Sequence, residues 1–164
     1  MRESVQQYPT IQEWACGPGR AQLVLDATGS TLAGTFSLEG AAIERNDSPI
    51  SPIYAGAISS GKFGSWDRVI LFANLQPGVY KVTQLRLSRV NAWFTTPVPD
   101  SNDFIVTLEP DRLLYLGRII LEEKAGFPAR TTIRLSPDTE RRSAAFTILK
   151  DRFPTSPCAA LLAR

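Results

Sequence analysis

The stretch that decides the fold of this chain is Val69-Ile70-Leu71-Phe72-Ala73-Asn74-Leu75-Gln76-Pro77-Gly78-Val79-Tyr80-Lys81-Val82. Two runs of apolar, strand-forming residues flank the pair Pro77 and Gly78. Proline presets its φ angle for a turn and glycine tolerates a positive φ, so this pair is typical of a tight turn. The stretch therefore predicts a β-hairpin at the centre of a sheet protein.

The chain on both sides of this stretch continues a strand pattern. Short segments of alternating or continuous apolar residues are bounded by turn residues, which is typical of β-strands. The predicted strands cover residues 21–27, 31–38, 53–58, 104–109, 113–121 and 131–135. The segment 113–121 is apolar at both odd and even positions, so we expect it to be the most buried strand.

Two local features predict irregularities. The apolar phase changes at Thr83 and Gln84, which predicts a β-bulge or a strand that bends from one sheet toward another. Glycine and proline are dense between residues 39 and 67, so this segment is expected to be a long loop broken only by the strand at 53–58. Because long loops in compact domains are often functional, this is where we place a binding loop.

One helix is predicted near residues 137–152. Ser136 can cap its first turn, Pro137 suits the first helical position, and Pro154 ends it. An apolar stripe at helical spacing comprises Ala144, Ala145, Ile148 and Leu149. We expect this helix to cover an open edge or end of the sheet.

Strands separated by turns, followed by one late helix, predict a mainly β fold: an antiparallel β-sandwich with one C-terminal α-helix. A chain of 164 residues fits one domain. Residues 1–20 mix proline and glycine with polar residues and are expected to form an irregular N-terminal arm, pinned to the body by Trp14. Residues 21–164 are expected to form the single β-sandwich domain.

Charge and hydropathy exclude several classes of partner. The net charge of +2 gives no broad electrostatic field, so nucleic-acid binding is not expected. No apolar run approaches the roughly 18–20 residues that span a bilayer. The start of the chain directs no export as written, and an exported protein trimmed of its signal would look the same.

The chain contains no histidine, which removes the commonest general base and the commonest metal ligand together. Triads of the Ser-His-Asp and Cys-His types are thereby excluded. With only two cysteines, a Cys-rich structural zinc site is excluded as well. We expect neither a metal nor another cofactor.

Cys16 and Cys158 allow two interpretations. They are either two separate buried thiols or a disulfide that clasps the N-terminal arm to the segment after the helix. A clasp would stabilise the fold by roughly 2–4 kcal/mol. It would also favour an oxidising compartment.

Two short motifs suggest chemistry but lack its context. Residues 56–62 have the spacing of a phosphate-binding loop, but Phe63 follows where a hydroxyl should bind magnesium, and no helix opens there. Ser59 and Lys62 match the Ser-x-x-Lys pattern of some hydrolases, which requires a helix. Carboxylates at turns and strand ends offer a second enzymatic alternative: Asp67, Asp103, Glu109 and Asp111.

Five aromatic residues lie in or near predicted loops: Tyr54, Phe63, Trp66, Trp93 and Phe94. Exposed aromatic rings can anchor a protein partner or stack on sugars. These five are therefore our candidates for ligand or partner binding, and a carbohydrate-binding module is an alternative function.

The turn motif Leu75-Gln76-Pro77-Gly78-Val79-Tyr80 resembles the Leu-x-Pro-Gly-x-Tyr hairpin of transthyretin-like (prealbumin-like) and carboxypeptidase-regulatory-like β-sandwich modules. The later segments 104–110 and 114–117 are similar to a phenylalanine strand and a Tyr-Leu-Gly strand that follow that hairpin in uncharacterised bacterial envelope proteins and lipoproteins. The resemblance covers roughly residues 69–121.

Such modules are usually not enzymes. The resemblance implies a non-catalytic binding or accessory module in the periplasm or cell envelope, whose partner is a protein or another envelope component. The alternatives are the carbohydrate-binding module and the hydrolase described above.

Overall fold

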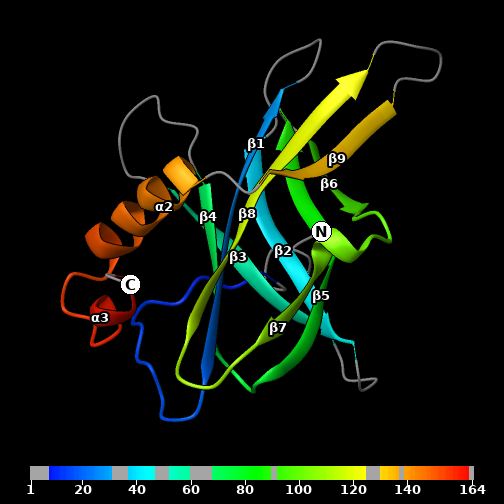
Figure 1. Cartoon of the computed structure of the whole chain (residues 1–164). Coiled ribbons are helices and arrows are strands. Elements are labelled where there is room, and N and C mark those ends of the chain that lie inside the picture. Colours follow the sequence, from blue (N-terminus) through cyan, green and yellow to red (C-terminus); the bar gives the residue numbers. More distant parts are fainter. Residues whose placement is uncertain are drawn as a thin grey trace.

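The structure, a computed structural model, describes residues 8–30, 37–46, 52–59, 68–89, 92–124, 130–136 and 139–162. Within them, strands form one curled, mixed sheet and two short helices pack on its outer side (Figure 1). The strands are β1 (Ala21–Ser30), β2 (Ser37–Arg45), β3 (Ile53–Ser59), β4 (Arg68–Leu75), β5 (Gly78–Arg89), β6 (Ala92–Pro97), β7 (Ile105–Leu108), β8 (Leu113–Lys124) and β9 (Arg130–Ser136). The helices are α2 (Thr139–Arg152) and α3 (Ala159–Leu162), and a single 3-10 turn, η1, covers Asn102–Phe104.

The sheet has two walls joined by one strand. Its order is β6-β5-β2-β3-β4-β1-β8-β9, and β7 also pairs with β5. The first half of β3 pairs with β2 and its second half with β4, so β3 turns the corner between the walls. The expected sandwich of two sheets is therefore not confirmed. The expectation of purely antiparallel pairing is wrong, because β1 and β8 are parallel.

The central hairpin prediction is also wrong. Pro77 and Gly78 do turn the chain, but β4 pairs with β1 and β3, whereas β5 pairs with β2, β6 and β7. The link between Leu75 and Gly78 carries the chain from one wall to the other. The Tyr80 hydroxyl, which donates to the Gln76 carbonyl oxygen at 2.6 Å, ties this corner together. The residue types of a turn show that the chain reverses direction there. They do not show which neighbouring strands the two flanking strands will pair with.

The long loop predicted from residue 39 is wrong in its first described part, since β2 continues to Arg45, whereas the strand predicted at 53–58 is confirmed as β3. Gly40 and Gly56 are register partners in these two strands. A Cβ atom on Gly40 would lie 2.6 Å from the ring of Tyr8, and one on Gly56 would collide with the Tyr8 carbonyl oxygen. These glycines therefore allow another segment to approach the strands closely.

Two hydrophobic cores lie on opposite faces of the sheet. Along β1, Leu23 and Leu25 face an inner core between the walls, while Val24 faces an outer core beneath α2 and the N-terminal arm. The same alternation along β4 sends Ile70 inward and Leu71 outward. Burying each large side chain contributes about 1.5–3 kcal/mol, so both cores support the fold.

The most buried strand is β1, which corrects the expectation for residues 113–121. All described side chains of β1, residues 21–26, are buried, because this strand has β4 and β8 beside it and a core on each face. Strand β8 lies next to β9 at the end of the sheet order, and its Leu114 is 38% exposed. A strand with apolar residues at both odd and even positions, such as residues 113–121, is therefore not necessarily buried completely.

Helix α2 ends at Arg152, before Pro154, as predicted. Ser136 is the last residue of β9, and Pro137 lies outside the described residues. The helix packs on the outer face of β1, β4 and β8 rather than on an open edge or end, which corrects that expectation. No described helix is both long enough and apolar enough to cross a membrane.

The irregularity predicted at Thr83 is confirmed. The register of β2 against β5 passes from Ala42 opposite Gln84 to Ile43 opposite Val82, leaving Thr83 as the extra residue. A bulge of this kind bends a strand and increases its twist. It lies in the strand that pairs with both β6 and β7 along its length.

Candidate ligand-binding site

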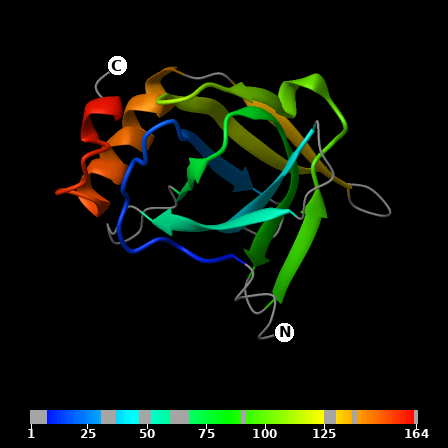
Figure 2. The same cartoon turned by 90° about the horizontal axis from the view of Figure 1, so that it is seen from below.

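The N-terminal arm, residues 8–20, crosses the outer side of the sheet before it enters β1 (Figure 2). No helix or strand is formed along this arm. Two attachments hold it, one at Tyr8 and one around Trp14 and Cys16. Between and beyond them it borders three cavities.

At the first attachment, Tyr8 is 7% exposed and lies over the paired glycines of β2 and β3. The Gly56 N–H donates to the Pro9 carbonyl oxygen at 2.9 Å, and the Gln84 side-chain amide donates to the Tyr8 hydroxyl at 2.6 Å. The Tyr54 ring meets the Tyr8 ring edge-on at 5.1 Å. Burial raises the pKa of the Tyr8 phenol above 10.0, against the opposing effect of the Gln84 bond.

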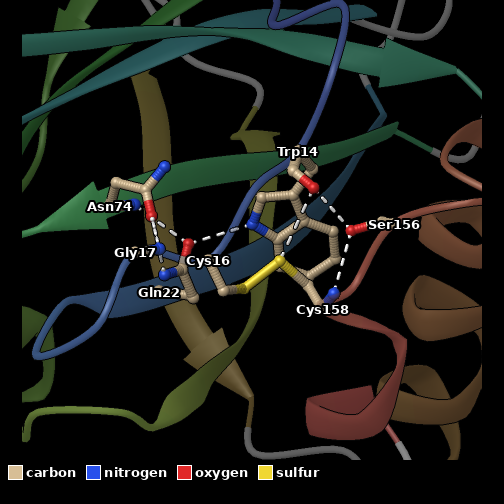
Figure 3. Close-up of a disulfide and its surroundings, with 7 residues drawn as sticks. All are labelled: Trp14, Cys16, Gly17, Gln22, Asn74, Ser156 and Cys158. Atoms are coloured by element: carbon tan, nitrogen blue, oxygen red, sulfur yellow. Dashed lines mark hydrogen bonds between the residues drawn. A yellow bond between two sulfur atoms is a disulfide. The ribbon is translucent and has the colours of Figure 1, made fainter.

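The second attachment is covalent (Figure 3). Cys16 and Cys158 form a disulfide with their Cα atoms 5.6 Å apart, within the usual range, so the structure confirms the clasp rather than two separate thiols. The indole of Trp14 is 3% exposed and donates to Gln22 Oε1 at 3.0 Å. The Ser156 hydroxyl donates to the Trp14 carbonyl oxygen at 2.6 Å.

Asn74 connects this clasp to the end of β4. Its Oδ1 atom accepts from the Gly17 N–H at 3.0 Å and from the Gln22 side-chain amide at 3.3 Å. Its own backbone N–H donates to Gln22 Oε1 at 2.9 Å, in a residue whose φ is 58°. Two donors on Oδ1 fix the orientation of the amide, so the Asn74 NH₂ group points away from the clasp, as Figure 3 shows.

Asn74 also lines a cavity of about 270 Å³, which we call the arginine cavity. It forms where β2 and β4 end, β3 and β5 begin, and the arm enters β1. Its surface is mostly apolar. The lining residues are Arg20, Arg45, Ile53, Asn74, Leu75, Gln76 and Tyr80.

Arg45 is held in place at this cavity. Its Nη1 donates to Gln76 Oε1 at 3.2 Å, its Nη2 donates to the Pro77 carbonyl oxygen at 3.3 Å, and its guanidinium carbon lies 5.5 Å from the centre of the Tyr80 ring. A Cβ atom at Gly78, where φ is 151°, would collide with the Arg45 guanidinium. Gly78 is thus required both by the turn and by the position of Arg45.

The other two cavities border the arm where it meets the end of α2. One, of about 290 Å³, lies between residues 12–15 of the arm and residues 152–157. The other, of about 370 Å³, is lined by Thr10, Ala57, Ile58, Ser59 and Arg152. Ser59 is exposed on β3 rather than on a helix, so the local geometry that the Ser-x-x-Lys mechanism requires is not found there. Lys62 lies outside the described residues.

The predicted aromatic patch is only partly within the described residues. Tyr54 is half-buried and its ring packs against Tyr8. Trp93 and Phe94 lie on β6, and the structure describes only their backbone; Phe63 and Trp66 lie outside the described residues. Tyr54 therefore serves the attachment of the arm, and the structure does not bring the five residues together into one described surface.

The carboxylates proposed for hydrolysis are engaged in local contacts where they are described. Asp111 accepts from the Gly19 N–H at 2.7 Å, and Glu109 pairs with Arg112 at 3.3 Å. Asp103 is exposed within η1, and Asp67 lies outside the described residues. These contacts stabilise turns and do not place two described carboxylates across a cleft.

One exposed acid has a shifted pKa. The hydrogen bond from the Lys81 ammonium, together with its charge, lowers the pKa of Asp100 below its ordinary value of 3.8. The two groups are 2.5 Å apart, and 90% of the Asp100 side chain is exposed. Solvent screens such a pair, so it belongs to the surface and not to a catalytic site.

Sequence reasoning missed the two arginines. Arg20 and Arg45 are far apart in the chain, and no spacing links them. Each ends a segment at the same end of the sheet, so only the topology brings them together. In the sequence, only the turn residues Pro77 and Gly78 indicated this end of the sheet, where the two arginines meet.

No family model matches this chain, and no curated protein or solved structure is significantly similar to it. A function is therefore not carried over from a relative. The interpretation of the site depends on the contacts of its own residues.

Proposed function

We propose that the chain is a non-catalytic binding or accessory module of the bacterial cell envelope, and that its partner is a protein or another envelope component. The observation that carries the proposal is the arginine cavity. Guanidinium, amide and phenol groups around an apolar surface can hold a ligand. They provide no nucleophile or general base suited to neutral pH.

The clasp supports the proposed location. Disulfides persist in oxidising compartments such as the periplasm and are rare in the cytosol. Cys16 and Cys158 are bonded in the structure, and the bond closes the arm over the sheet. A periplasmic or cell-envelope location is part of the proposal.

The resemblance to transthyretin-like and carboxypeptidase-regulatory-like sandwiches also enters as a proposal. Two walls facing one inner core support a relation at the level of layers. At the corner, Pro77 and Gly78 turn the chain and the Tyr80 hydroxyl bonds the Gln76 carbonyl, which gives these residues of the resembling motif a structural role. The absence of pairing between β4 and β5 argues against an identical topology.

A retention assay tests the function. Immobilised oxidised protein is exposed separately to the solubilised envelope fraction and the cytosolic fraction of its source cells, with excess free protein as competitor. We expect competable retention of an envelope component. Retention from the cytosolic fraction alone, or none from the envelope, would contradict the proposal.

A turnover assay tests the non-catalytic part. The protein is incubated with ester, peptide and glycoside substrates, with Ser59→Ala as the matched variant. We expect no turnover above the level of buffer. Turnover that is lost in Ser59→Ala would establish a hydrolase instead.

A further inference from the structure

We propose that the disulfide between Cys16 and Cys158 is a redox-sensitive latch on the N-terminal arm. A small thiol attacks the Cys16 sulfur while the protein is folded. The opened latch loosens the arm around Trp14 but not at Tyr8. This reactivity goes beyond the proposed function, since it requires neither the arginine cavity nor a binding partner.

The two cysteines of the latch differ in their exposure to solvent. Cys158 is 0% exposed and belongs to the outer core, whereas Cys16 packs against that core and is only partly buried. Exchange between a thiol and a disulfide requires the attacking thiolate to reach one of the two sulfurs. In the folded protein, a reagent from solvent therefore reaches this bond from the Cys16 side.

A cavity next to the disulfide gives a small thiol room to approach. It is the cavity of about 290 Å³ between the arm and residues 152–157. Its walls include Ala15 and Pro157, the residues that directly precede Cys16 and Cys158. One water molecule needs roughly 10–15 Å³ of cavity volume, so the space suffices for a small thiol with part of its hydration shell.

The exchange is balanced between the protein and two thiols. The first thiolate forms a bond with Cys16 Sγ, the bond between the two protein sulfurs breaks, and its electron pair leaves on Cys158 Sγ, which takes up a proton from water. A second thiolate attacks the reagent's sulfur in this mixed disulfide and releases Cys16 as a thiol. Two small thiols are thereby oxidised to one disulfide, and the protein disulfide is reduced to two thiols.

The fold already provides a place for the Cys158 thiol. Cys158 Sγ lies 3.7 Å from the Trp14 carbonyl oxygen, which accepts from the Ser156 hydroxyl at 2.6 Å (Figure 3). A carbonyl oxygen has two lone pairs, so it can accept from the new thiol as well. The Cys158 N–H donates to Ser156 Oγ at 3.0 Å, which holds this residue without the disulfide. A buried thiol is therefore compatible with the core as it stands.

Opening the latch weakens only one end of the arm. At this end a weak S–H donor replaces a covalent bond, and noncovalent contacts remain, such as the hydrogen bond from the Trp14 indole to Gln22. At the other end, the hydrogen bond from Gln84 to the Tyr8 hydroxyl involves neither cysteine. The opened arm can therefore lift from the outer core at Trp14 while Tyr8 stays in place.

Trapping the mixed disulfide in the folded wild-type protein tests which sulfur reacts. The oxidised protein is incubated with glutathione without denaturant, quenched with acid at early times, unfolded, alkylated and mapped by peptide mass spectrometry. We expect at least about tenfold more glutathione on Cys16 than on Cys158, because buried cysteines are inert. The same reaction in urea is the control and should lose this preference. Equal labelling of the folded protein, glutathione mainly on Cys158, or no reaction without denaturant would overturn the proposal.

The single variants Cys158→Ser and Cys16→Ser form a matched pair, each with one remaining thiol. Treated with glutathione disulfide, folded Cys158→Ser should form its mixed disulfide at least about tenfold faster than folded Cys16→Ser. In urea both thiols are exposed and the two rates should be similar. Equal rates in the folded state would contradict the assignment of Cys16 as the reactive site. The trapping experiment decides the question without either variant, should one of them fail to fold.

Hydrogen exchange in the wild-type protein tests the effect of the latch on the arm. Reduction with dithiothreitol should speed the exchange of the Trp14 indole N–H at least about tenfold. The Gly56 amide, which donates to the Pro9 carbonyl oxygen, should change by less than about twofold. An unchanged indole would show that the disulfide is not a latch on the arm. Faster exchange at both sites would show that opening is not confined to the Trp14 end, and would overturn the proposal as well.

Discussion

The two attachments of the N-terminal arm differ in kind: one is covalent and the other is not. Around Trp14 and Cys16 the arm is held by a disulfide, a buried indole and side-chain hydrogen bonds. At Tyr8 it is held without a covalent bond, in a slot made by two glycines of the sheet. The covalent attachment is built from side chains of the arm and its partners, whereas the attachment at Tyr8 depends on the missing side chains of Gly40 and Gly56. Five experiments test how strong each attachment is and whether the two are independent.

The largest effect is expected from Trp14→Ala. Removing a buried tryptophan typically costs about 3–5 kcal/mol of unfolding free energy, because a cavity remains. Urea unfolding measures the loss. Trp14→Phe is the control, since it keeps an aromatic ring and should cost less. If the two variants lose equally little, the disulfide alone holds this end of the arm.

Removing the disulfide should have the next largest effect. The double variant Cys16→Ser/Cys158→Ser frees the unfolded chain and should lose about 2–4 kcal/mol in urea unfolding. Reduced wild-type protein is the matched control and should lose the same amount.

Hydrogen exchange at the Gly56 amide, which donates a hydrogen bond to the Pro9 carbonyl oxygen, tests whether the attachment at Tyr8 depends on the disulfide. We expect this amide to remain protected in the double variant under native conditions. Fast exchange would mean that the two attachments form one cooperative unit.

Gly56→Ala should cost about 1–3 kcal/mol, because its Cβ atom forces the arm away from the strand. Thermal and urea unfolding measure this cost. The control is the same substitution in a chain shortened to begin at Ile11, where it should be much milder. An equal cost in both chains would show that the glycine serves the strand and not the arm.

The smallest effect is expected from Tyr8→Phe, which removes the hydrogen bond with Gln84 and should cost about 1 kcal/mol. The raised pKa of Tyr8 means that the folded state favours the neutral phenol. Wild-type stability should therefore fall as the pH rises from 10 through that pKa. The variant should lack this part of the pH dependence. Parallel stability curves for the two proteins above pH 10 would show that Tyr8 is not buried in solution.

The sequence was informative where a residue acts through its neighbours in the chain. Apolar runs located β1 and β4, alternation located β7 and β9, the change of phase located the bulge at Thr83, and Pro154 marked the end of α2. The two cysteines suggested the clasp, because they could bond only with each other.

The sequence was misleading where a residue acts on a distant segment. Gly40 and Gly56 were counted only among the glycines that break up residues 39–67, although they make room for Tyr8. Pro77 and Gly78 were interpreted as a hairpin, although the strands that they join pair elsewhere. The arginine cavity was missed for the same reason, because Arg20 and Arg45 meet only after the sheet has curled.

The disulfide also determines how the molecule would carry mechanical load. Cys16 and Cys158 are 142 positions apart, so the sheet and α2 lie within one covalent ring. A pull applied to residues before Cys16 and after Cys158 passes through the sulfur–sulfur bond and bypasses the hydrogen bonds of the sheet. In a force-extension experiment the oxidised chain should lengthen only by its outer segments, and a reducing agent should release the remaining length.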